Sequence, residues 1–250
     1  MKKPSPALIS TALFFLVWEI FARYLGLLFI LPWPTAIIKK IWDLKIPLFK
    51  YHLPATLEVA VISILFSLVL GGVLAIIMDK NEYIEECIYP IIVTTQTIPI
   101  TALAPIFILW FGYTIWSKIL VSVLVAFFPI TITLHDGLKS TKNEYIELFK
   151  SMNASDWDIF MKLKVPTALP YFFSSLKISI PLVLIGAAIG EWLGANAGLG
   201  YFSKRMMTQL DGAGVFAPIV LISVIAIAFV QLISIPVSYT HLTLPTKLEV

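Results

Sequence analysis

The sequence has little charge for its length. Asp, Glu, Lys and Arg make up 13% of its 250 residues, whereas soluble domains average about 25% charged residues. Hydrophobic residues make up 59% of the chain, and its mean hydropathy is +0.92. A soluble domain of this length needs charge on its surface and cannot bury so many apolar side chains. The composition therefore excludes a soluble globular protein and predicts a membrane protein.

The sequence also lacks the residue groupings of cofactor sites, nucleic-acid arms and nucleotide-binding loops. Cys87 is the single cysteine, which excludes an internal disulfide, and the three histidines share no metal-ligand spacing with it. The 18 basic and 15 acidic residues are scattered, without a run of like charges. No G-x-x-x-x-G-K-[ST] motif occurs, so the chain has no such loop for the phosphates of ATP. We expect no cofactor, no nucleic-acid partner and no enzymatic activity.

Apolar runs long enough to cross a bilayer dominate the chain. The first follows Lys2 and Lys3 and has no small-residue cleavage site after it, so we interpret it as a retained span and not as a signal peptide. The predicted spans are residues 7–31, 59–78, 87–112, 115–134, 171–195 and 215–237. The predicted fold class is an all-α membrane protein with about six transmembrane helices.

Three local features accompany these spans. Glu19 and Arg23 in the first span are four residues apart, so we expect them to pair on one face of the helix. Residues 32–57 mix Trp and Ile with Lys, which suits a helix at the membrane surface. Only Tyr113 and Thr114 separate the third and fourth spans, which predicts a tight hairpin there.

The polar loop between the fourth and fifth spans, residues 135–169, contains two helix-start patterns. Residues 141–144 (T-K-N-E) and 155–158 (S-D-W-D) both fit the capping box [ST]-x-x-[DE]. Asn153 lies between them, and Asn tolerates the left-handed conformation at the end of a helix. We therefore predict helix, sharp turn, helix, with Pro166 ending the second helix. Apolar residues in both helices favour docking of a second protein; packing against the chain's own span ends is the alternative.

Within this loop, the run Glu147-Leu-Phe-Lys-Ser-Met-Asn153, nine further residues, and Leu163-Lys-Val165-Pro166 have the spacing E-A-A-x3-G-x9-I-x-L-P. The loop resembles the EAA loop of permease subunits of ATP-binding-cassette (ABC) importers. Glu147 and Pro166 are identical to the motif, whereas larger apolar residues replace its two alanines and Asn153 replaces its glycine. The resemblance implies that the residues coupling the chain to an ATPase are Glu147, Leu148, Phe149, Asn153, Ala154, Leu163, Val165 and Pro166.

Other segments are similar to the sulfonate, nitrate and taurine branch of the same family. They are Tyr89-Pro90, Gln96-Thr-Ile-Pro99-Ile-Thr-Ala102-Leu-Ala-Pro105, Trp110-Phe-Gly112, Phe128-Pro129, Ala168-Leu-Pro170, Glu191 and Gly198-Leu-Gly200-Tyr. The resemblance covers residues 5–237, which is nearly the whole chain.

The resemblance implies a type I importer permease with an outer first span and five core spans around a translocation path. The implied partners are an ABC ATPase homodimer, a second permease copy, an extracytoplasmic solute-binding protein and the bilayer of the bacterial inner membrane. The coupling loop, residues 139–167, is then cytoplasmic, as is the N-terminus. The implied cargo is a small organic or anionic solute, such as a sulfonate, nitrate or a vitamin precursor. We assign residues 1–237 to the permease domain and interpret the abruptly polar residues 238–250 as a tail foreign to it.

The third span has the features expected of a path wall. Pro90, Pro99 and Pro105 each remove a helix hydrogen bond, and irregular backbone inside a bilayer needs protein or water around it. The alternative is that its hydroxylated residues simply pack against other spans. The predicted path residues are Gln96, Thr97, Pro99 and Thr101.

Lys177 and Glu191 are the charged residues of the fifth span. They are 14 residues apart, or about 21 Å along a helix, so they cannot pair with each other. We expect Lys177 to extend to the cytoplasmic interface, and Glu191 to bond the turn at 194–200 or a partner subunit, with gating as an alternative role.

Two other classes of function stay open on the sequence. A secondary transporter would need half-repeats and membrane-embedded carboxylates, for which Glu58 and Glu191 are the candidates. A membrane enzyme would need a nucleophile with its base or a metal cluster, and no such grouping is present in the sequence. Co-purification of an ATPase subunit discriminates among these classes.

Overall fold

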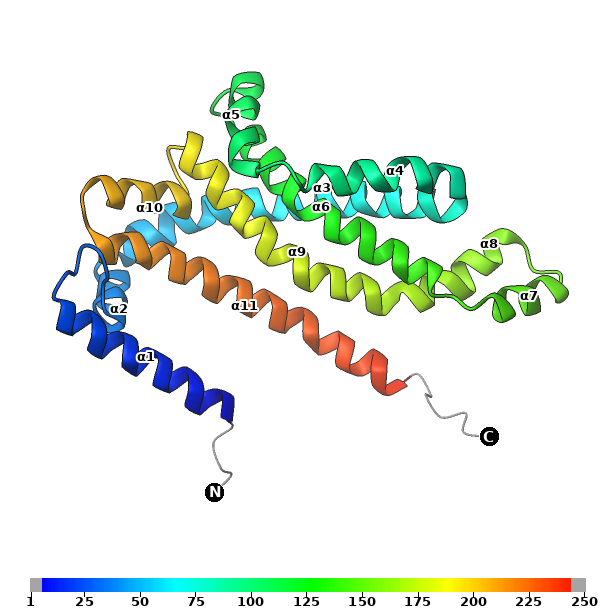
Figure 1. Ribbon diagram of the computed structural model, residues 1–250, viewed down its shortest axis with the longest axis horizontal. Helices are drawn as coiled ribbons and strands as arrows, with labels where there is room; N and C mark the ends of the chain where they lie inside the picture. The colour runs from blue at the N-terminus through cyan, green and yellow to red at the C-terminus, as the bar shows by residue number, and fades with distance from the viewer. Residues whose placement is uncertain (1–5, 244–250) are drawn as a thin grey trace.

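The computed structural model describes residues 6–243, with side chains up to residue 234, and every element in this range is a helix (Figure 1). Five helical stretches are long and apolar enough to span a membrane. They are Pro6–Leu25 (α1), Pro47–Lys80 (η1, Pro47–His52, with α3, Leu53–Lys80), Ile115–Lys139 (α6), Asp156–Gly194 (ending in α9, Val165–Gly194) and Gly212–Ser234, within α11 (Gly212–Thr243). The bent pair α4 (Glu82–Thr95) and α5 (Ile100–Phe111) is the sixth candidate. The predicted all-α membrane fold is confirmed.

The centre of the bundle consists of α3, α6 and α9, with α11 against α9. Small residues allow these helices to approach closely, as is usual between membrane helices. A Cβ atom at Gly186 would lie 2.6 Å from the Cα of Ser122, so α9 and α6 are in backbone contact there. The hydroxyl of Ser179 donates to the Ala126 carbonyl across the same interface (3.2 Å). α6 and α9 therefore form the closely packed middle of the bundle.

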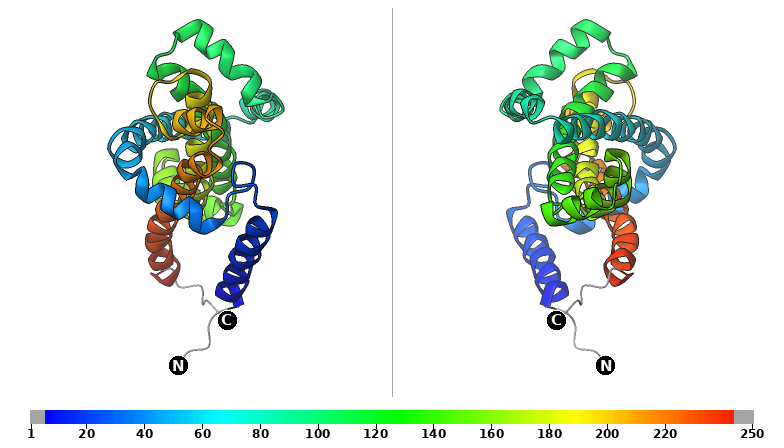
Figure 2. Two further views of the ribbon diagram at one scale, coloured as in Figure 1. Left: turned by 90° about the vertical axis from the view of Figure 1, so that its left-hand side faces the viewer. Right: turned by 90° about the vertical axis from the view of Figure 1, so that its right-hand side faces the viewer.

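The first helix lies at the edge of the bundle (Figure 2). Its side chains are almost all exposed. The predicted pairing of Glu19 with Arg23 is confirmed, with 2.6 Å between Glu19 Oε1 and Arg23 Nε. Glu19 also accepts hydrogen bonds from the N–H and hydroxyl of Thr35 (3.0 and 2.7 Å). Thr35 lies in the first turn of α2 (Pro34–Asp43), so the Glu19 carboxylate connects the first helix to α2.

The predicted surface segment is helical, as α2 and η1. Ile37 and Leu48 on it are buried, whereas Ile38, Trp42 and Ile46 are exposed. Figure 1 shows α2 and α10 (Leu199–Thr208) at one end of the long axis, with α7 (Asn143–Ser151) and α8 (Asp156–Ile159) at the other. The two ends therefore present different helices to the two sides of a membrane.

The third span, predicted for residues 87–112 with its backbone interrupted by prolines, is a broken helix. Its two helices, α4 and α5, meet at a bend of 96°. Pro99 caps α5 with extended backbone (φ −60°, ψ 120°), and proline disfavours a helical conformation at the residue before it. The tight turn predicted before α6 is confirmed, with Gly112 at φ 67° and Thr114 as the N-cap of α6.

Candidate functional site

The polar loop forms the predicted helix, turn and helix. Asn153 adopts φ 61°, which confirms the left-handed turn between α7 and α8. The second capping box is also confirmed, because Ser155 and Asp158 bond each other's backbone N–H. The first is wrong: the N-cap of α7 is Lys142 and makes no side-chain cap bond. The hydroxyl of Thr141 is buried instead of reaching the helix start.

The expectation that Pro166 ends the second helix is wrong. Helical structure continues from Asp156 to Gly194, through a π-helical turn at Phe160–Lys164 (η2) and into α9. Pro166 lies in the first turn of α9, where a missing N–H is tolerated, and the widened turn before it accommodates the ring. The loop therefore continues directly into the long span α9 as one helical stretch.

The loop protrudes from the end of the bundle (Figure 1), and large apolar side chains on it are exposed. Met152 is 72% and Trp157 65% exposed, with Tyr145, Leu148 and Met161 also exposed. Within the described part of the chain, α7 makes no extensive contact with another helix, whereas Ile159 of α8 is buried. Packing against the chain's own span ends therefore accounts for one side of α8 and leaves α7 uncovered.

The predicted coupling residues are spread over α7, the turn after it, η2 and the first turn of α9. The exposed ones are Glu147, Leu148, Asn153 and Pro166, and the half-buried ones are Phe149, Ala154, Leu163 and Val165. Apolar side chains beside a carboxylate on a protruding helix pair form a surface that another protein can cover.

The predicted path residues gather at the bend between α4 and α5. Gln96, Thr97, Pro99 and Thr101 are all exposed there. The Thr97 hydroxyl donates to the Thr94 carbonyl (2.8 Å), and the Gln96 amide lies 3.5 Å from the Leu124 carbonyl of α6. The Thr97 hydroxyl and the Gln96 amide thus donate to carbonyl groups near the break in the helix. Because both side chains are exposed, their remaining donors and acceptors can bond a group outside this chain.

Lys177 lies elsewhere, half-buried on α9, so the structure does not bring it together with the path residues at the bend. Glu191, on the same helix, is 1% exposed and accepts the Gly200 N–H on Oε2 (2.8 Å). This bond agrees with the expected contact to the turn at 194–200. It places a carboxylate at the N-terminus of α10, where a helix dipole stabilises negative charge.

Two further side chains complete the cap of α10, and neither was anticipated from the sequence. Thr56 accepts the Leu199 N–H (2.8 Å), and His52 Nδ1 accepts the Gly198 N–H (3.2 Å). Three successive N–H groups of one helix start are thus bonded by side chains from η1, α3 and α9. The sequence signal that existed was a His and a Thr at the start of a long apolar run, which does not indicate their partners.

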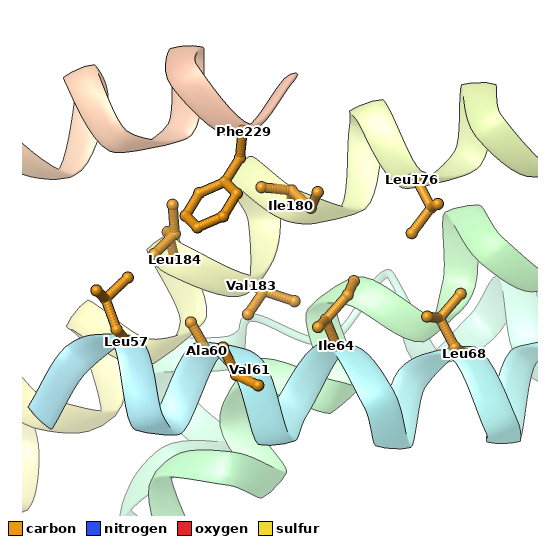
Figure 3. Close-up of a pocket in the computed structure, with 10 residues that line it drawn as sticks. All are labelled: Leu57, Ala60, Val61, Ile64, Leu68, Leu176, Ile180, Val183, Leu184 and Phe229. Carbon is orange, nitrogen blue, oxygen red and sulfur yellow. The ribbon is translucent and has the colours of Figure 1, made fainter. Parts of the chain in front are cut away.

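The apolar pocket between α3, α9 and α11 is not suited to a polar solute (Figure 3). Its volume is about 230 Å³. Its walls are hydrocarbon, from side chains that include Leu57, Ile64, Leu176, Ile180, Val183 and Phe229. Such walls offer no hydrogen bonds, and a polar group enters them only at a cost in free energy. Among the side chains that the structure describes, those of residues 6–234, no three potential metal ligands gather at one place.

Comparisons with known proteins agree with this architecture. The chain is 53% identical over 230 residues to the formylaminopyrimidine transport permease protein ThiX of Halalkalibacterium halodurans, covering 91% of this chain and 92% of that protein. It is 32% identical to a probable ABC transporter permease protein of Haemophilus influenzae, covering 86% and 88%. It is 28% identical to a putative aliphatic sulfonates transport permease protein, SsuC, of Bacillus subtilis, covering 87% and 80%.

The fold is similar to a chain of the MetNI methionine ABC transporter in an inward-facing conformation. The TM-score is 0.62 at 17% identity, covering 76% of this chain and 98% of that one. These relatives are transport permeases, which are not enzymes, and their family is associated with an ATPase partner and a binding protein. Residues 67–238 match the family described as the binding-protein-dependent transport system inner membrane component. The chain therefore belongs to that family, as a multi-pass inner-membrane permease of the sulfonate, nitrate and taurine branch of ABC importers.

Proposed function

We propose that two copies of this chain form the membrane path of an importer for formylaminopyrimidine or a closely related aminopyrimidine. A soluble binding protein delivers the solute, and an ATPase homodimer that docks on residues 139–167 drives transport. The observation that carries the solute class is the 53% identity to a formylaminopyrimidine transport permease over nearly the full length of both chains.

The docking assignment is supported by the protruding α7 and the uncovered apolar side chains on it. Leu148 is exposed on this helix and Met152 at its C-cap, and Glu147 lies beside Leu148. Burial of such residues against a partner is favourable at about 25 cal/mol per Å² of apolar surface, and a charged residue on the same helix adds orientation. The continuity of α8 with α9 then carries the partner's movement into the bundle.

The path assignment is supported by the bend at Gln96–Pro99. Exposed polar side chains and interrupted backbone at membrane depth are tolerated against protein or water, not against lipid. An aminopyrimidine carries ring nitrogens and amino groups, so the Gln96 amide and the hydroxyls of Thr97 and Thr101 offer it donors and acceptors without requiring a charge. Simple packing against a second copy is the competing explanation for the same exposure.

The test of this function is uptake into proteoliposomes that contain the permease with its ATPase, supplied with the binding protein. We expect ATP-dependent uptake of labelled formylaminopyrimidine, which an excess of unlabelled taurine or nitrate does not reduce. Uptake driven by an ion gradient without ATP would instead support the secondary transporter, which the family assignment does not favour. Competition by taurine as effective as that by unlabelled formylaminopyrimidine would contradict the solute assignment.

Docking is tested separately by pull-down of the ATPase in detergent. Glu147→Lys and Phe149→Asp place charge on the coupling surface, so each should abolish ATPase association and transport while membrane insertion stays normal. Glu86→Lys is the matched control, because Glu86 is an exposed glutamate of the neighbouring α4 outside the loop. Normal co-purification of the ATPase with both loop variants would contradict the assignment of residues 139–167 as its docking site.

A further inference from the structure

The α3–α4 hairpin is fastened to the coupling loop by a largely buried ion pair. Lys164 Nζ donates to both carboxylate oxygens of Asp79, at 2.8 and 2.9 Å. The side chain of Asp79 is 3% exposed and that of Lys164 21% exposed. Asp79 lies in the last turn of α3, and Lys164 is the final residue of the π-helical turn that joins α8 to α9. The pair therefore joins the end of the coupling loop to the tip of the hairpin.

A second ionic contact joins the same hairpin to the start of the loop. Glu85 in the first turn of α4 pairs with Lys139, the last residue of α6, from which the chain continues into α7. Nε2 of His135, one turn earlier on α6, lies 3.0 Å from the other Glu85 oxygen. The hairpin tip is thus held at both ends of the loop, by Lys139 where the loop begins and by Lys164 where it ends.

The hairpin tip is short, and a side chain caps it. Asn81 is the one residue between α3 and α4, and its side chain accepts the N–H groups of Tyr83 and Ile84 (3.0 and 3.3 Å). From this cap, α4 stays helical through Pro90 to Thr95, a length of about 21 Å at 1.5 Å per residue, and reaches the bend at Gln96. A displacement of the tip is therefore carried along α4 to the residues proposed to line the path.

We propose that the ion pairs Asp79–Lys164 and Glu85–Lys139 transmit movement of the coupling loop to the α3–α4 hairpin and, through α4, to the bend at 96–101. These four are positioning residues, and the proposal rests on the proposed function. A buried charge that loses its partner is unfavourable, so hairpin and loop move together while the pairs are intact. Energetic coupling between two sites requires a structural element with two arrangements, and both sites must shift the equilibrium between them. Here the element is the hairpin, and the two sites are the coupling loop and the bend. Without the pairs, the ATPase would still move α9 directly, but α4 would no longer follow.

The experiment reverses each charge and then restores the pair. Asp79→Lys and Lys164→Asp are each reconstituted with the ATPase and binding protein, as is the double variant with the charges exchanged. We expect solute moved per ATP to fall about tenfold or more in both single variants. Asp79 lies on α3, outside the docking segment 139–167, so Asp79→Lys should also bind the ATPase normally and hydrolyse ATP. The exchanged pair should recover to within about threefold of the native chain, since a paired interaction shows as non-additivity in a double-mutant cycle. Where a reversed charge prevents assembly, Asp79→Asn is measured in its place with the same expectation as a single variant.

A conformational readout separates transmission from general stability. In a Cys87→Ala background, the reactivity of Thr97→Cys toward a water-soluble thiol reagent should change when ATP is trapped in the native complex. This change should disappear in Asp79→Asn although the ATPase still binds. Lys40→Gln, which breaks the Lys40–Asp211 pair (2.6 Å) at the other end of the molecule, is the matched control and should retain it.

Three results have distinct meanings. Failure of the native chain to bind an ATPase would contradict the proposed function and not the ion pairs specifically. Native transport per ATP in both single variants would overturn the proposal. Failure of the exchanged pair to recover, with the ATPase bound, would also overturn it, because the charges would then not act as a pair.

Discussion

The Gly198→Ala substitution tests the packing of the α10 start on Glu191. Gly198 adopts φ 117° and ψ 159°, a region that is essentially restricted to glycine. A Cβ atom there would lie 2.2 Å from Cδ of Glu191 and 2.4 Å from each carboxylate oxygen. The alanine variant must therefore both strain its backbone and displace a buried carboxylate. The hydrogen bond from the Gly200 N–H to that carboxylate is lost if the carboxylate moves.

Gly112 supplies a matched control for the size of the effect. It adopts a similar backbone region (φ 67°, ψ −167°), but a Cβ atom there would meet nothing within 4 Å. Gly112→Ala should therefore lower the free energy of unfolding only through backbone strain, by about 1–3 kcal/mol. In Gly198→Ala, overpacking against Glu191 should lower the free energy of unfolding by about 1–3 kcal/mol more. Because 1 kcal/mol lowers the melting temperature of a chain of this size by roughly 2–4 °C, Gly198→Ala should melt roughly 2–12 °C below Gly112→Ala.

The measurement is thermal unfolding of the purified permease in detergent, followed by tryptophan fluorescence and by recovery on size exclusion. Glu191→Ala removes the carboxylate that a Cβ atom at position 198 would strike. In that background Gly198→Ala should cost no more than Gly112→Ala does in the native chain. Equal melting temperatures for the two alanine variants in the native background would show that the turn does not lie against Glu191, and the reasoning would be refuted.

Two further predictions concern the loop and the bend. Asn153→Gly should preserve transport and ATPase association, whereas Asn153→Val should reduce both, because a β-branched residue at φ 61° is strongly disfavoured; equal uptake by the two variants would mean that this turn does not need its left-handed residue. In a Cys87→Ala background, Thr97→Cys and Thr101→Cys should react with a small water-soluble thiol reagent, whereas Leu65→Cys, exposed on the apolar face of α3, should not. If neither position 97 nor position 101 reacts in any nucleotide state, the polar residues at the bend serve helix packing and do not line the path.

Several features were predictable because they depend on residues close together in the sequence. Glu19 and Arg23 pair across one helical turn, Ser155 and Asp158 form a capping box, and Asn153 takes the left-handed turn. Each follows from helix geometry that the local sequence already contains. The pattern 141–144 shows the limit of this reasoning, because the helix begins one residue later and the Thr141 side chain is buried instead.

The continuation of the helix through Pro166 could not be predicted from the local sequence either. A proline inside a helix usually kinks or ends it, although a π-helical turn can lie within a helix that continues. Here the widened turn at Phe160–Lys164 precedes it, so α8 and α9 form one unbroken helical stretch. The local sequence contains no indication of that turn, because its neighbours in the bundle decide whether a widened turn is favourable.

By itself, the sequence determined that this protein lies in a membrane, that it has about six apolar segments long enough to cross one, and where a two-helix loop interrupts them. Composition and apolar periodicity suffice for this, because a bilayer rewards long apolar helices whatever their neighbours are. The tertiary structure alone decided the 96° bend of the third span, the cap of α10 by His52 from 146 residues away, and the Asp79–Lys164 pair across 85 residues. Partners so distant in the chain are selected by helix packing, in which small residues fix how closely two backbones approach and therefore which polar groups meet.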